Sequence, residues 1–140
     1  MKTSILLVDD CRENLENFRE LLELEGYTIL TTMDPEKAYS ISKNMLPELI
    51  VSDIKMNGMT GFELIQLIRL NIETCHIPFI FHSAHSEPSV IKLGKRMGAS
   101  DFIVKPSCPS RLYRAINVAL RQEIFVSTQM LNDDWKYVLF

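Results

Sequence analysis

Four short apolar runs along the chain each stop on polar residues. They are 5–8 before Asp9-Asp10, 49–52 before Asp53, 79–81 before His82-Ser83, and 102–104 before Lys105-Pro106. Short uninterrupted apolar runs are typical of strands that are buried on both faces of a parallel sheet. Ligands of such sheets bind beyond the carboxyl ends of the strands, so we expect these polar side chains to meet at one edge.

Segments with helical signals separate these runs. Asp34 followed by proline predicts a helix start at 35, and Thr60 to Glu63 fits a capping box. The segments expected to be helical are the stretch from Cys11 to Gly26, 35–43, the stretch from 61 with a buried stripe of Phe62, Ile65, Ile68 and Ile72, 87–97, and the stretch from 109; a further strand is expected over 27–32. Five strands alternating with five helices predict an α/β fold with a parallel sheet covered on both faces.

Composition fits one small domain. The chain has 140 residues, of which 46% are hydrophobic and 24% charged. A formal net charge of −3 gives no reason to expect direct nucleic-acid binding, which usually shows as a basic face. No apolar stretch approaches the roughly 18 residues of a membrane span, and the strand pattern follows Met1 almost at once, so we expect no signal peptide, no membrane contact and a cytoplasmic location. Three cysteines without paired spacing predict reduced thiols.

The polar residues at the expected edge combine three acids, a hydroxyl and an ammonium. Carboxylates gathered at Asp9, Asp10 and Asp53 would repel one another unless a cation lay among them. Mg²⁺ prefers oxygen ligands of this kind, together with phosphate oxygens. A metal and Lys105 facing a phosphoryl group would stabilise charge on its oxygens while the Asp53 carboxylate attacked, which would give an acyl phosphate.

Several separated motifs occur in an order typical of one family. They are Leu7-Val8-Asp9-Asp10, Ser52-Asp53-Ile54-Lys55-Met56 followed by Gly58 and Gly61, Ser83-Ala84, Gly98-Ala99 before Asp101-Phe102, and Lys105-Pro106. Over residues 3–125 the chain resembles the receiver domains of two-component response regulators. Residues 126–140 are expected to be a C-terminal tail or the start of a linker or output region.

The resemblance implies a flavodoxin-like (βα)5 three-layer sandwich, with a central five-stranded parallel sheet in the order 2-1-3-4-5 and a cis Lys105-Pro106 bond. It implies that Asp53 is the phosphoacceptor and that Ser83 and Lys105 hold the phosphoryl oxygens. The Mg²⁺ ligands that it implies are Asp9, Asp10, Asp53 and the backbone carbonyl of Lys55.

The resemblance also implies how such a domain would signal. Phe102 stands where the family has a switch aromatic that turns inward with the Ser83 loop, and Lys55 and His85 flank the phosphoryl group and tune its loss. The donor would be a sensor histidine kinase or a histidine phosphotransfer protein. Output would pass through the face formed by 87–97, 102–104 and the helix from 109, to an output domain or protein or within a homodimer. Only self-catalysed phosphotransfer and autodephosphorylation are expected, not multiple-turnover catalysis.

Other classes fit the residues less well. An aspartate-nucleophile, Mg²⁺-dependent phosphohydrolase normally has its general acid two residues after the nucleophile, where this chain has Lys55. A flavin-binding module would need a phosphate cradle where Asp9-Asp10 stands. A receiver-like docking domain that is not phosphorylated is the third alternative. Asp9-Asp10 could also simply cap the first helix, and His82 is interpreted as an ordinary strand residue.

Overall fold

The computed structural model describes residues 2–132 of the chain, and the side chains of residues 2–121. The strands are β1 Ser4–Val8, β2 Thr28–Thr32, β3 Leu49–Ser52, β4 Phe79–Ser83 and β5 Asp101–Val104. The helices are α1 Arg12–Leu24, α2 Pro35–Met45, α3 Gly61–Leu70, α4 Pro88–Arg96 and α5 Pro109–Asn132. The elements alternate as the sequence predicts.

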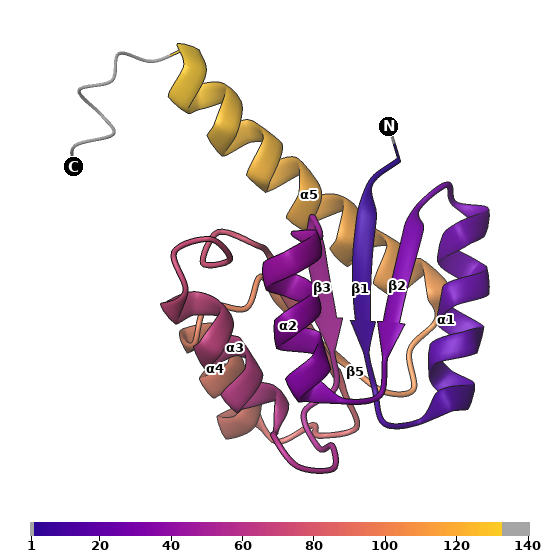
Figure 1. Ribbon diagram of the computed structural model, residues 1–140. Coiled ribbons are helices and arrows are strands. Elements are labelled where there is room, and N and C mark those ends of the chain that lie inside the picture. Colours follow the sequence, from indigo (N-terminus) through magenta and orange to yellow (C-terminus); the bar gives the residue numbers. More distant parts are fainter. Residues whose placement is uncertain (1, 133–140) are drawn as a thin grey trace.

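The five strands form one parallel sheet in the order β2-β1-β3-β4-β5. Helices α1 and α5 cover one face of the sheet, and α2, α3 and α4 cover the other (Figure 1). Successive side chains of a strand point to opposite faces, so β4 sends Ile80 to the α1/α5 face and Phe79 and Phe81 to the α2–α4 face. The predicted fold class and strand order are confirmed, and the Lys105-Pro106 bond is cis.

Local signals in the sequence start two of the helices. Asp34 accepts a hydrogen bond from the Glu36 N–H at 2.9 Å. The Thr60 hydroxyl accepts one from the Glu63 N–H at 3.2 Å, as a capping box requires. Each cap satisfies a backbone donor that the first helical turn would otherwise leave unpaired.

The stripe predicted along α3 is correct over two turns and wrong at its last position. Ile65 and Ile68 are fully buried, and Phe62 is partly buried against the same core. Ile72 is 89% exposed, because α3 ends at Leu70 and the chain turns away from the sheet.

Helix α5 continues across the expected domain boundary at residue 125. It runs from Pro109 to Asn132 and projects beyond the body of the domain (Figure 1). The boundary therefore stays a prediction. The aromatic end of the expected tail, 133–140 with Trp135, lies outside the described residues.

The described residues also bear on the expectations for the cysteines and for a membrane span. Cys11, Cys75 and Cys108 are free and exposed. Within residues 2–132, no helix combines the length and the apolarity that crossing a bilayer requires.

Candidate functional site

Three carboxylates meet at the carboxyl edge of the sheet. Asp9 and Asp10 follow β1 directly, and Asp53 follows β3, which pairs with β1. Each residue offers a carboxylate oxygen, and these oxygens all lie within 4.8 Å of one another. The convergence that the strand ends predict is present, because neighbouring parallel strands end at the same edge.

Lys105 brings a positive charge to this cluster. Its Nζ donates hydrogen bonds to Asp9 Oδ2 at 2.7 Å and to Asp53 Oδ2 at 3.1 Å. Burial acts to lower the Lys105 pKa, but the hydrogen bonds and charges of Asp9 and Asp53 outweigh it and raise the pKa above its ordinary value. The site therefore holds a charged ammonium between two acids.

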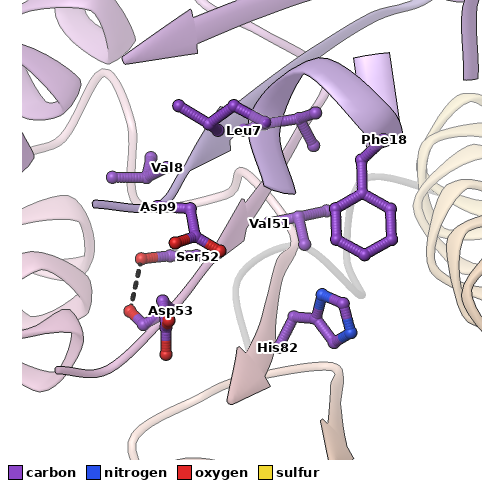
Figure 2. A pocket seen from close by; sticks show the side chains of 9 residues that line it. Leu7, Val8, Asp9, Phe18, Val51, Ser52, Asp53 and His82 are labelled. Atoms are coloured by element: carbon purple, nitrogen blue, oxygen red, sulfur yellow. Dashed lines mark hydrogen bonds between the residues drawn. The ribbon is translucent and has the colours of Figure 1, made fainter. Parts of the chain in front are cut away.

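The backbone fixes the orientation of Asp53. Its N–H donates to the Val8 carbonyl at 2.9 Å, and its Oδ1 accepts from the Ile54 N–H at 2.7 Å. The Ser52 hydroxyl donates to the Asp53 carbonyl at 2.7 Å (Figure 2). A Cβ at Gly61 would overlap that same carbonyl oxygen, so the start of α3 can lie against it only with glycine there. With Oδ1 held, Oδ2 remains for Lys105 or a ligand.

Asp9 has a second contact at the start of α1. Its Oδ1 accepts a hydrogen bond from the Cys11 N–H at 2.9 Å, while its Oδ2 contacts Lys105. The capping and site interpretations of Asp9 are therefore compatible, since each uses a different oxygen. Asp10 is only half-buried.

An open pocket of about 610 Å³ lies over the acidic edge. It is lined by Asp10, Asn14, Asp53, Lys55, Met56, Asn57, Ser83, Ala84, His85, Glu87 and Lys105. Ser83 is buried, and its Oγ accepts a hydrogen bond from the His85 N–H at 3.2 Å. The His85 Nδ1 lies 3.4 Å from Glu87 Oε2. Asn14 and Glu87 were not predicted; each lies within four residues of a predicted site residue, which was the available signal.

Phe102 is already buried in this structure, with 5% of its surface exposed. Its ring centroid lies 5.8 Å from that of Phe81. A Cβ at Gly94 of α4 would come within 3.1 Å of a Phe102 ring carbon, so the helix backbone lies against the ring. The inward position that the resemblance associates with switching is occupied here.

His82 lies in strand β4, as the sequence predicts, and it is also buried and hydrogen-bonded. It is 4% exposed, and its ring contacts Phe18 of α1 edge-on, with centroids 4.8 Å apart. Its ring lies beside Phe18 in a small pocket that Asp9 and Asp53 also line (Figure 2). Its Nε2 is hydrogen-bonded to the Ser107 hydroxyl at 3.1 Å. The alternation of β4 was the signal, since it places His82 on the same buried face as Ile80.

The chain is similar to proteins of one known family. The model of the response regulator receiver domain matches residues 5–117. The transcriptional regulatory protein YvrH of Bacillus subtilis (strain 168) is 35% identical over 138 residues, which cover 98% of this chain and 57% of that protein. Protein PilH of Pseudomonas aeruginosa is 28% identical, over 83% of this chain and 96% of PilH.

Solved structures agree with the sequence relatives. The structure of the chemotaxis protein CheY4 of Vibrio cholerae, crystallised at low pH, has a TM-score of 0.81 and 27% sequence identity, covering 86% of this chain and all of that one. The chain spans about half the length of YvrH and 28% of the response regulator PleD of Caulobacter vibrioides (strain NA1000 / CB15N). The matched family, the parallel sheet in the order β2-β1-β3-β4-β5 and the acidic edge agree, and the chain belongs to the receiver domains of two-component response regulators.

Proposed function

We propose that Asp53 accepts a phosphoryl group from a phosphohistidine of a sensor histidine kinase or histidine phosphotransfer protein. The observation that carries this proposal is the position of Asp53 Oδ2, 3.1 Å from the Lys105 ammonium and within the cluster of three carboxylates. Oδ1 is engaged by the backbone, so Oδ2 is the oxygen available for attack.

The donor set fits a hard divalent cation. Asp9, Asp10 and Asp53 supply carboxylate oxygens from within 4.8 Å of one another, and the Lys55 carbonyl is the further ligand that we propose. Mg²⁺ takes oxygen ligands and is usually held by one or two carboxylates together with phosphate oxygens. Bound there, it would neutralise charge on the transferring phosphoryl group.

The transfer can be written for this chain's own residues. Asp53 Oδ2 forms a bond to phosphorus while the bond from phosphorus to the donor's imidazole nitrogen breaks, and that nitrogen keeps the electron pair. Lys105 exchanges its hydrogen bond with Asp53 Oδ2 for one with a phosphoryl oxygen. The Ser83 hydroxyl turns from the His85 N–H to donate to a second phosphoryl oxygen, which moves the loop after β4.

The change at Ser83 gives the domain its output. We propose that contacts at the face of α4, β5 and α5 change, toward an output domain, another protein or a second copy. Moving a population from 1:99 to 99:1 takes about 5.5 kcal/mol. Hydrogen bonds to charged groups contribute about 1.5–3 kcal/mol each, so a few of them suffice.

Residues at the rim of the pocket would set the lifetime of the phosphoryl group. We propose that Lys55 and His85 govern the access of water to the acyl phosphate. The His85 ring lies near Glu87, and this pair occupies the side of the pocket next to Ser83. The domain would then catalyse only its own phosphorylation and dephosphorylation, and it would not turn over free phosphate esters.

Intact-mass measurement after incubation with acetyl phosphate tests the acceptor. The parent should gain one phosphoryl group in the presence of Mg²⁺ and none after chelation, whereas Asp53→Asn should gain none. Asp34→Asn is the matched control, because asparagine also caps helices and Asp34 lies outside the acidic cluster. Equal labelling of the parent and Asp53→Asn would disprove the acceptor assignment. An unlabelled parent would favour a docking domain, and continuous release of phosphate from esters would favour a phosphohydrolase.

A further inference from the structure

We propose that His82 and Ser107 act together to position Lys105 for phosphoryl transfer, through a side-chain hydrogen bond that ties the loop after β5 to strand β4. The inference rests on the proposed role of Lys105 in holding a phosphoryl oxygen. His82 and Ser107 are positioning residues in it, since neither faces the open pocket over the acidic edge.

The loop after β5 loses its backbone tether to β4 immediately after Lys105. The Lys105 N–H donates to the Ser83 carbonyl at 2.7 Å, which continues the pairing of β4 with β5. Pro106 follows and has no N–H to donate. The bond from Ser107 Oγ to His82 Nε2, at 3.1 Å, then joins the loop to β4 again. Two hydrogen bonds therefore hold the backbone around Lys105 to β4, one at Lys105 itself and one two residues later at Ser107.

His82 is a rigid anchor for this loop. It lies in the paired part of β4, opposite Ile103 of β5, and only 4% of its surface is exposed. Its ring packs edge-to-face with Phe18 at a centroid distance of 4.8 Å, which restricts its rotamer. Ser107 gains a fixed partner, whereas a surface serine would exchange between water molecules.

The ring is neutral at ordinary pH. Burial, helped by the nearby Lys105 charge and opposed by Asp9 and Asp53, lowers the His82 pKa to about 4. A neutral imidazole has one donor and one acceptor nitrogen and can bond a hydroxyl in either sense. It adds no positive charge that would compete with Lys105 for the two acids.

The alternative is that His82 only fills the core. A buried imidazole needs a hydrogen-bond partner, and Ser107 would satisfy it without any effect on the site. The two interpretations differ in what removal of the Ser107 hydroxyl does. A core filler predicts a loss of stability alone, whereas a positioning pair predicts slower transfer through Lys105, because small displacements of a charged group weaken its contact with the reacting atoms.

The test measures the rate of phosphorylation by acetyl phosphate at saturating Mg²⁺, together with Mg²⁺ affinity by calorimetry. Loss of one positioning hydrogen bond predicts that Ser107→Ala is slower by about threefold to tenfold. Calorimetry should show that Mg²⁺ saturates each variant, so that a displaced Lys105, which bonds two of the three carboxylates, does not change the rate through metal occupancy. Ser107→Thr keeps the hydroxyl and should restore the rate, and the exposed Ser110→Ala is the matched control with the parent rate.

A second background shows whether the effect passes through the lysine. In Lys105→Ala, which should itself be slow, adding Ser107→Ala should lower the rate no further. His82→Leu, which keeps a buried apolar group, should slow the parent as Ser107→Ala does. If His82→Leu does not fold, the serine variants still decide.

The outcomes separate the two proposals. A parent without an Asp53 adduct, or Lys105→Ala at the parent rate, would overturn the proposed function. A normal adduct and a slow Lys105→Ala, but a Ser107→Ala that keeps the parent rate or slows equally in both backgrounds, would overturn the positioning role alone.

Discussion

The two faces of the sheet are packed by different means. On the α2–α4 face, Phe81 contacts the rings of Phe62, Phe79 and Phe102, with centroids 5.0 to 5.8 Å apart. On the α1/α5 face, the buried strand residues are aliphatic, and a hydrogen-bonded imidazole ends the row at His82. Both faces have an aliphatic core; the α2–α4 face adds a cluster of aromatic rings to it, and the α1/α5 face adds a hydrogen-bonded imidazole.

This difference bears on how the two halves of the site are supported. Ser83 is the last residue of β4 and follows His82 directly. Phe102 lies among the aromatic rings, so its conformation depends on packing. Lys105 is tied through Ser107 to His82, so the position of the ammonium depends on a hydrogen bond. We expect the first to respond to changes in side-chain volume and the second to changes in polarity and pH.

The largest expected effect compares two neighbours of β4 on opposite faces. Ile80 and Phe81 are both fully buried. We expect Phe81→Ala to lower the free energy of unfolding by about 3–5 kcal/mol and Ile80→Ala by about 2–4 kcal/mol, because the larger ring leaves the larger cavity. Denaturant unfolding measures both. A larger loss for Ile80→Ala would show that the aromatic rings around Phe81 relax into the cavity that Phe81→Ala leaves.

The next effect is a pH dependence of the unfolding free energy that arises on the α1/α5 face, at His82. Below pH 6.5 the unfolded chain protonates His82, but the folded chain does so only near its pKa of about 4, so the unfolding free energy falls as pH drops between these values. The difference between the two values corresponds to at most roughly 3 kcal/mol. His82→Leu should lack this part of the acid loss, and Phe81→Leu should retain it.

Unfolding curves of the three proteins at pH 7 and pH 4, without metal, give the comparison. Between pH 7 and pH 4 the parent should lose more unfolding free energy than His82→Leu does. Parallel pH dependences for all three proteins would show that the imidazole titrates freely in the folded state.

The smallest expected effect probes the aromatic face at α4. A Cβ at Gly94 would lie 3.0 Å from a Phe81 ring carbon and 3.1 Å from a Phe102 ring carbon. Gly94→Ala gains about 1 kcal/mol of helix propensity and loses a similar amount to crowding, so we expect a net change within about 1 kcal/mol. The aromatic proton resonances of Phe102 should move nonetheless, whereas Ser89→Ala on the exposed side of α4 should leave them unchanged. Unmoved Phe102 resonances in Gly94→Ala would mean that the ring does not depend on this contact.

Much of this molecule could be predicted because its signals are local. Apolar runs ending on Asp9, Asp53 and Lys105 gave the strands and their edge, and caps at Asp34 and Thr60 gave helix starts. The prediction failed where a pattern continued past the end of its element. Ile72 keeps the α3 spacing, but the helix ends before it, so the residue is exposed.

Other features depend on contacts between distant segments. His82 and Ser107 are 25 residues apart, and neither residue type indicates a partner by itself. The burial of Phe102 depends on a glycine in α4 and a ring in β4, which no spacing rule joins.

The sequence by itself therefore determined the alternation of elements, the parallel sheet and which side chains stand at its edge, since periodicity and capping act within a few residues. Only the tertiary structure decided that Lys105 lies between Asp9 and Asp53, that Asp9 serves two contacts, and that an imidazole anchors the loop beyond Lys105. These arrangements depend on distances and on exclusion of water, and both exist only once the strands and helices have packed.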